Sequence, residues 1–247
     1  MAVFVAAHKK FSADLPENYE VLQVGAALHD SLGFLADNAG ENISEKNPNF
    51  CELTGLYWIW KNRSDEYKGL VHYRRYFEKC GKKLDDGEIK SILKDYDIIL
   101  PKIEYLRESA WEELPKHSGR EKDLINLKKV IGELYPDYLP AFDTVMSGNT
   151  LHLYNMMIAP EKVFNAYCEW LFDILFALEP MTDMSDYSDY EKRVFGFLSE
   201  RMLNVWVLHN DLKVKSLNVK NPESSFKENL RFFLRRQKNK VLFSLNK

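Results

Sequence analysis

Short apolar runs separated by amphipathic stretches predict strands that alternate with helices along most of the chain. The expected strands lie at residues 3–7, 21–24, 67–73, 97–101 and 151–158. The expected helices lie at residues 52–61, 122–134, 160–178 and 189–208, with Pro160 placed in the first turn of the third. This alternation predicts an α/β fold with a mainly parallel central sheet flanked by helices. Ligands of such sheets bind beyond the carboxyl ends of the strands.

Length and composition are compatible with one α/β domain. The chain has 247 residues, of which 45% are hydrophobic, so it can bury one sizeable core. The apolar run after Met1 is short and has no basic residues before it, which favours a buried strand over a signal peptide. No apolar run approaches the ~18 residues of a membrane span. The three cysteines are odd in number and widely spaced, which indicates a reducing cytoplasm and neither a disulfide framework nor a zinc site.

The end of the chain differs in charge from the rest. Residues 220–247 carry eight Lys or Arg against two Glu, a net charge of +6 within a chain whose total is −3. Phe226, Leu230, Phe233 and Leu234 recur there at helical spacing, with basic residues between them. We therefore divide the chain into a body, 1–219, and a tail, 220–247. The tail is expected to be a basic amphipathic helix that lies on an anionic membrane surface or packs on the body. Nucleic acid is not expected as a partner, because the body is acidic.

Groups that bind anions follow two of the expected strands. His8 and Lys9 come directly after the first strand, where a nucleotide-binding sheet contacts its base, ribose or diphosphate. The segment 72–76, His-Tyr-Arg-Arg-Tyr, ends the strand that begins at residue 67. Arginine pairs bidentately with phosphate oxygens, so Arg74 and Arg75 are candidates for binding the diphosphate of a nucleotide. The alternative is that one of the two arginines points to a structural carboxylate.

Several blocks of the sequence resemble those of one bacterial family. They are Asn-Ile-Ser-x-Lys-Asn at 42–47, Cys-Glu-Leu-Thr-Gly-Leu-Tyr-Trp at 51–58, Gly-Leu-x-His-Tyr-Arg-Arg-Tyr at 69–76, Leu-Tyr-Asn-Met at 153–156, Tyr-Cys-Glu-Trp-Leu-Phe at 167–172 and Phe-Leu-Ser-Glu-Arg-x-Leu-Asn-Val-Trp at 197–206. This family was first catalogued as a domain of unknown function and is grouped with glycosyltransferases of capsular polysaccharide and O-antigen gene clusters. The resemblance covers roughly residues 1–219.

The resemblance implies a Rossmann-like A-type glycosyltransferase fold and a hexosyltransferase with a UDP-sugar as donor. It suggests UDP-galactofuranose or UDP-galactose as donor and a lipid-linked oligosaccharide as acceptor. Taken with the strand-end positions, it assigns donor binding to His8, Lys9, Asn42, Lys46, Asn47, His72, Tyr73 and Tyr76. It assigns substrate binding to Glu52, Thr54, Trp58, Tyr154, Asn155 and Asn204. Core packing is the commoner role of aromatic residues such as Trp58, and is the alternative there.

The chain lacks the usual metal motif of this fold at the usual place. A-type glycosyltransferases usually hold a divalent cation with Asp-x-Asp at the end of a central strand. Asp95 and Asp97 match that motif but precede their apolar run, so Asp97 is expected at the entry of the strand. Arg74 and Arg75 stand where the acidic pair would be, and we expect them to stabilise the leaving group without a metal. A metal-dependent enzyme would need other carboxylates, such as Asp37 or Asp143.

Sugar transfer with inversion needs a base for the acceptor hydroxyl, and Glu200 is the first candidate. Glu200 to Asn204 resembles the Glu-x-x-Leu-Asn segment of some A-type transferases, and the two residues share a helix face. The alternative is an ion pair of Glu200 with Arg201 or Arg193 on a solvated face. Glu52 is the second candidate for the base. Cys51 as nucleophile is a weaker hypothesis, because a thiol before an apolar helix is usually buried and inert.

Two other classes of function stay open on the sequence. A nucleotidyl- or phosphotransferase would need a glycine-rich phosphate loop, and neither a Walker A nor a GxGxxG pattern occurs. A sugar- or anion-binding module without catalysis is the second alternative. Its binding groups would not need the dense polar loop at 42–47.

Overall fold

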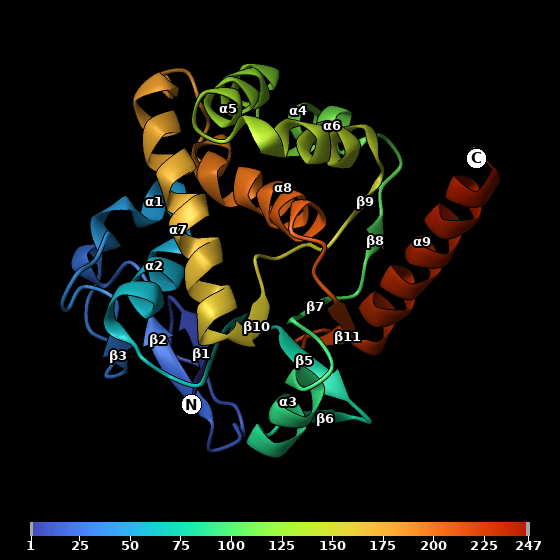
Figure 1. Cartoon of the computed structure of the whole chain (residues 1–247). Helices are drawn as coiled ribbons and strands as arrows, with labels where there is room; N and C mark the ends of the chain where they lie inside the picture. The colour runs from blue at the N-terminus through green and yellow to red at the C-terminus, as the bar shows by residue number, and fades with distance from the viewer. Residues whose placement is uncertain (1, 246–247) are drawn as a thin grey trace.

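The structure is a computed structural model that describes residues 2–245, and its centre is a nine-stranded sheet (Figure 1). The strand order is β3-β2-β1-β4-β10-β7-β11-β5-β6. The strands are β1 (Ala2–Ala7), β2 (Tyr19–Gln23), β3 (Leu35–Ala36), β4 (Tyr67–His72), β5 (Tyr76–Lys79), β6 (Lys82–Lys83), β7 (Ile98–Pro101), β10 (Met157–Pro160) and β11 (Val214–Lys220). A separate pair consists of β8 (Glu104–Tyr105) and β9 (Thr150–Leu151).

The sheet is mixed, which corrects the prediction of a mainly parallel one. β1 runs parallel to β2 and β4, and β7 runs parallel to β11. β10 lies antiparallel between β4 and β7 and joins the two halves of the sheet. β5 and β6 are antiparallel neighbours at one edge. Strand direction depends on which strands pair, and the apolar pattern of a single strand does not contain that information.

Helices cover the sheet on both faces and form a further layer above it (Figure 1). They are α1 (Asn47–Phe50), α2 (Leu53–Asn62), α3 (Asp86–Leu93), α4 (Ala110–His117), α5 (Glu121–Leu134), α6 (Leu139–Ser147), α7 (Glu161–Leu178), α8 (Val194–His209) and α9 (Phe226–Leu245). The expected helices at 52–61, 122–134 and 160–178 are confirmed within two residues, although Pro160 is the N-cap of α7. The helix expected from residue 189 begins at Val194, after a 3-10 turn at Glu191–Arg193.

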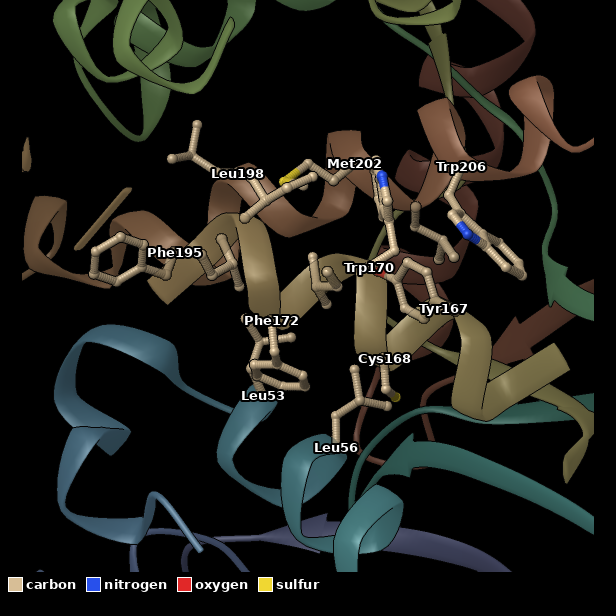
Figure 2. Packing of buried hydrophobic residues seen from close by; sticks show 14 of the residues in the cluster. Leu53, Leu56, Tyr167, Cys168, Trp170, Phe172, Phe195, Leu198, Met202 and Trp206 are labelled. Carbon is tan, nitrogen blue, oxygen red and sulfur yellow. The ribbon is translucent and has the colours of Figure 1, made fainter. Parts of the chain in front are cut away.

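Alternating side chains of β1 point into two hydrophobic cores. Phe4 packs with α2, α7 and α8 on one face, whereas Val3 and Val5 pack with β4 and α3 on the other. Figure 2 shows how the side chains of α7, among them Trp170 and Phe172, fill the space between α2 and α8. The apolar stripes of these helices therefore hold α8 in a fixed place relative to the sheet.

The strand expected at 151–158 is wrong. The chain forms the short strand β9, leaves the extended conformation, and returns to a sheet only at Met157. Tyr154 and Asn155 both have positive φ angles, 80° and 50°. His152 donates its backbone N–H to the Asn204 side chain at 2.8 Å, and the Asn204 amide donates to the His152 carbonyl at 3.0 Å. A side chain of α8 thus supplies the hydrogen bonds that a neighbouring strand would have made.

The tail forms α9, which confirms the helix expected there, and it runs beside β8 (Figure 1). The division predicted after residue 219 falls at the last residue of β11. The side chains of Phe226, Phe233 and Phe243 lie outside the described part of the structure. Within residues 2–245, none of the helices combines the length and the apolar character that crossing a bilayer requires.

Candidate active site

A cleft of about 830 Å³ lies where β1 and β4 end beneath α8. One side follows the two strands and is called the strand-side wall: His8, His72, Tyr73, Arg74 and Arg75. The other side comes from α4, α8 and the turn before α8, and is called the helix-side wall: Glu113, His117, Tyr190, Arg193, Phe197, Glu200 and Arg201. Asn47, Cys51, Glu52 and Tyr154 lie between the two walls.

The two arginines of the strand-side wall are held by a tight turn after β4. The backbone N–H of His72 donates to the Arg75 carbonyl at 3.2 Å, and that of Arg75 donates back at 2.9 Å. The turn leaves Arg74 exposed and Arg75 partly buried, with the Arg75 guanidinium 4.5 Å from the centre of the Tyr154 ring. Among residues 2–245, no carboxylate forms an ion pair with either arginine. Within these residues, the structure therefore does not support the alternative that one of the two arginines binds a structural carboxylate.

The two histidines of this wall add hydrogen-bonding groups without adding positive charge. Burial lowers the pKa of His72, and the nearby Arg75 lowers it further while Glu52 opposes the shift. Burial also lowers the pKa of His8, together with the charges of Arg74 and Lys9. The His8 ring stands edge-on to Tyr73, with centroids 5.2 Å apart. The positive charge on this wall therefore comes from the guanidiniums.

Glu200 of the helix-side wall has a strongly raised pKa. Burial raises the pKa of its carboxyl from 4.5 to about 7, and the charge of Glu52 adds to this, while Arg201 opposes it. Its Oε1 accepts a hydrogen bond from the Tyr154 backbone N–H at 2.9 Å. Tyr154 thus contacts Arg75 with its ring and Glu200 with its backbone. A carboxyl that titrates near neutral pH suits proton transfer at physiological pH.

Glu200 does not form the ion pair with Arg201 or Arg193 that was the alternative to its role as base. Arg201 is 2% exposed, and its guanidinium pairs with Glu113 of α4 and donates to the Phe197 carbonyl. Arg193 directs its Nε at the Cys51 sulfur, 3.3 Å away. Arg201 still acts on Glu200 through its charge, since it lowers the pKa of that carboxyl. The Glu113–Arg201 pair, which connects residues far apart in sequence, leaves Glu200 free to face the cleft.

Unusual backbone geometry concentrates beside the cleft. Cys51 has a φ of 53°, and Tyr154 and Asn155 follow each other in the left-handed region. Asn155 is held by its side chain, which donates to Glu52 at 2.8 Å and to the Gly196 carbonyl at 2.9 Å. Such strain in residues other than glycine persists only where neighbours enforce it, and it is common at active sites. Here it places the Tyr154 ring in the cleft.

The structure divides the residues predicted from the sequence into two groups. Those that line the cleft are His8, Asn47, Glu52, His72, Tyr73, Arg74, Arg75, Tyr154 and Glu200. Those that do not line it have partners in the fold. Two form ion pairs: Lys9 with Glu223, and Lys46 with Glu179. The others form hydrogen bonds: Asn42 with Asn38 and Gly40, Thr54 with Asp37, Trp58 with Ala39, Tyr76 with Tyr73, Asn155 with Glu52, and Asn204 with His152. Trp58 lies in the core, so its placement favours packing over sugar binding.

The sequence reasoning missed most of the helix-side wall. Tyr190 and Phe197 lie with ring centroids 5.1 Å apart, and the Arg193 guanidinium lies 5.2 Å from the Phe197 ring. The only signal in the sequence was their position just before Glu200. Cys51, which had been considered as a nucleophile, is not suited to that role, because burial raises the pKa of its thiol to about 11.

The described part of the chain contains no cluster of side chains that could bind a metal ion. Residues 2–245 contain no group of three or more His, Cys, Asp or Glu arranged to hold a metal. Asp37 is buried and accepts from Thr54 Oγ1 at 2.6 Å, and Asp143 pairs with Lys128. Asp97 accepts from the Lys213 N–H at 2.8 Å at the entry of β7, as predicted. The carboxylates named as alternatives thus lie apart and have other partners.

Comparison with known proteins identifies the family. The model of the family described as a domain of unknown function, DUF4422, matches residues 2–211. The chain belongs to this family. The match includes both walls of the cleft and ends before α9. A search of curated proteins found no match.

A solved structure described as the apo form of the bifunctional glycosyltransferase WbbM is similar to this chain, with a TM-score of 0.84 and 28% sequence identity. The similarity covers 91% of this chain and 45% of that protein, so the chain spans less than half of its length.

Proposed function

We propose that this DUF4422 chain is a glycosyltransferase that moves a hexose from a UDP-sugar to a hydroxyl of a lipid-linked oligosaccharide. One observation carries the proposal. Two guanidiniums without a carboxylate partner in residues 2–245 share a cleft with Glu200, whose pKa is raised to about 7. The guanidiniums can bind an anionic leaving group, and the Glu200 carboxylate can accept the proton of a neutral hydroxyl.

In the proposed reaction, Arg74 and Arg75 bind the diphosphate of the donor. The bond between the anomeric carbon and the diphosphate oxygen breaks, and its electron pair stays on UDP. Guanidiniums fixed beside that oxygen stabilise the developing charge. Because they supply positive charge themselves, we propose that transfer does not require a divalent metal.

Glu200 is the proposed general base. Its carboxylate takes the proton of the acceptor hydroxyl while that oxygen bonds to the anomeric carbon on the face opposite UDP. The configuration at that carbon inverts. The hydrogen bond from the Tyr154 N–H to Oε1 fixes the direction of the carboxyl, which leaves its other oxygen available to the acceptor. Glu52 lines the same cleft, but its Oε1 is already bonded to Asn155.

The similarity to a bifunctional glycosyltransferase supports the class of reaction. Because this chain spans 45% of that protein, the donor and acceptor in our proposal rest on the cleft and the sequence blocks of this chain. Our proposal names galactofuranose or galactose as the transferred sugar, capsular polysaccharide or O-antigen as the product, and the cytoplasm as the place of synthesis.

The test is to incubate the full chain with a panel of UDP-sugars and to follow UDP release and sugar transfer. We expect release from one donor above all others, and faster release when an acceptor glycan is added. Tight binding of a UDP-sugar without any release or transfer would contradict the proposal and would indicate a binding module. The Glu200→Gln variant is the control for release by a contaminant, because it keeps the size of the side chain.

A further inference from the structure

The tail helix α9 carries an exposed apolar stripe. Leu230, Leu234 and Val241 are 46%, 56% and 57% exposed, the highest values among the large hydrophobic residues of α9 whose side chains are described. They are spaced by four and seven residues. Because one turn takes 3.6 residues, these intervals of about one and two turns place all three on one face of the helix. Three neighbouring exposed apolar residues on one face indicate an interaction surface.

The stripe faces away from the protein, because the opposite side of α9 is docked on β8. Arg236 donates to the Ile103 carbonyl at 2.7 Å, and the Asn239 amide donates to the Tyr105 carbonyl at 2.7 Å. Asn239 is buried and follows Leu230 by nine residues, which is two and a half turns. The helix is therefore attached to the body by one side, next to β8 (Figure 1). Leu230 and Leu234 lie on the other side.

Exposed cations border the stripe. Lys227 precedes Leu230 by three residues, Arg231 precedes Leu234 by three, and Lys238 follows Leu234 by four. All three side chains are exposed. Residues three and four apart are neighbours on a helix surface, so these ammonium and guanidinium groups flank the apolar residues. Long basic side chains at such a border can reach phosphate groups while the leucines enter the acyl region.

We propose that the face of α9 formed by Leu230, Leu234, Val241, Lys227, Arg231 and Lys238 docks on an anionic membrane surface. A packed terminal helix would bury its apolar side and expose its basic side, whereas α9 docks through Arg236 and Asn239 and exposes Leu230 and Leu234. The net charge of +6 at 220–247 favours anionic lipid over a neutral partner surface. This inference concerns attachment and does not rest on the proposed sugar transfer.

Attachment through this face would keep the cleft close to the bilayer. The segment before α9 forms an ion pair at 3.9 Å, Lys9–Glu223, with the residue that follows His8 of the strand-side wall. The charge of Arg235 in α9 lowers the pKa of Tyr154, a residue of the cleft, against the dominant effect of burial. A glycan acceptor that is linked to a lipid would then be within reach of Glu200.

The test is co-sedimentation of the full chain with vesicles of phosphatidylcholine, with and without phosphatidylglycerol. We expect binding only to the anionic vesicles and weaker binding at high salt. Replacing Leu230 and Leu234 together with Gln should lower the partition coefficient at least about tenfold. Replacing Lys227 and Arg231 with Gln should lower it about fivefold per charge.

The matched control is Ile125→Gln with Leu134→Gln on α5, two exposed apolar residues on a different helix. We expect this pair to bind vesicles as the wild type does. Equal binding to neutral and anionic vesicles, no binding to either, or unchanged binding of the Leu230/Leu234 variant would overturn the proposal. So would a dimer in lipid-free solution that this variant converts to a monomer, because the stripe would then bind a second copy. Melting temperatures equal to that of the wild type verify folding.

Discussion

Arg74 and Arg75 on the strand-side wall and Arg201 on the helix-side wall are held in opposite ways. On the strand-side wall, Arg74 and Arg75 end a tight turn, and neither pairs with a carboxylate in residues 2–245. On the helix-side wall, Arg201 is buried and its charge is neutralised by Glu113. Removing one member of a buried ion pair destabilises the fold because the other charge is left uncompensated, whereas cations that face a cleft without a partner are available to a ligand. The first wall should therefore respond to mutation in activity, and the second in stability as well.

The largest expected effect is that of Glu200→Gln. Loss of the base should lower kcat by roughly 10²–10⁴-fold, since that is the usual contribution of a positioned proton acceptor. The measurement is the rate of UDP release with acceptor present. Glu169→Gln on α7, which is exposed and outside the cleft, is the control and should retain full activity. A Glu200→Gln variant with more than a tenth of the wild-type rate would exclude the role of base.

Arg201→Met tests the paired arginine. Removing it leaves Glu113 without its partner. Breaking a buried ion pair typically lowers the free energy of unfolding by about 3–5 kcal/mol. We expect a loss of about 3 kcal/mol, because the Glu113 side chain is 24% exposed. Denaturant unfolding measures the change. Arg74→Met is the matched comparison and should leave stability within about 0.5 kcal/mol of the wild type. If both variants lose the same stability, the contrast between the two walls is wrong.

Arg74→Ala and Arg75→Ala test the arginines that face the cleft. Each should raise the barrier to transfer by roughly 2.7–4 kcal/mol, the cost of losing one oriented donor to a developing charge. Turnover is measured at saturating donor, with melting curves to verify the fold. Arg107→Ala, an exposed arginine away from the cleft, is the control. Turnover near that of the wild type in both variants would contradict the phosphate role.

The raised pKa of Glu200 should also appear in the stability of the protein. The folded state keeps this proton up to a pH of about 7, whereas the unfolded chain releases it near 4.5. Between these values the folded state binds more protons, so its stability falls as pH rises. Glu200→Gln removes this dependence. Its melting temperature relative to the wild type should therefore be higher at about pH 8 than at about pH 5. An equal difference at both pH values would indicate an ordinary pKa.

The smallest expected effect is that of chelation. If the strand-side arginines neutralise the diphosphate, UDP release should continue unchanged in EDTA. The control is an established metal-dependent transferase assayed in the same buffer. Complete loss of activity, restored by Mn²⁺ or Mg²⁺, would show that a cation takes part and that the arginines do not suffice.

The strand-side wall could be predicted from sequence because four of its five residues, His72 to Arg75, are consecutive and His8 directly follows β1. A buried strand and the five residues after it fix where His72, Arg74 and Arg75 lie, without knowledge of the rest of the fold. The helix-side wall depends on contacts between distant segments. Glu113 and Arg201 are 88 positions apart, and Glu200 acquires its raised pKa only when α8 packs over the sheet. No local pattern contains these contacts.

The segment 151–158 shows a second limit. Leu151, His152 and Leu153 alternate as a strand does, and the pattern alone favours extended structure. Asn204 provides the hydrogen bonds that a strand would need, and Glu200 and Glu52 hold the two left-handed residues that follow. Tertiary contacts therefore override the local preference for an extended strand, at the point where this segment enters the cleft.

The position of β10 has a consequence for how this protein acquires its structure. Since β10 is the strand that joins the half of the sheet containing β1 and β4 to the half containing β7, the sheet cannot close until Met157–Pro160 has left the ribosome. The half containing β7 also needs β11, which ends at Lys220. Contacts between segments so distant in sequence slow folding. The nascent N-terminal strands should therefore depend on protection from aggregation until most of the chain has been synthesised.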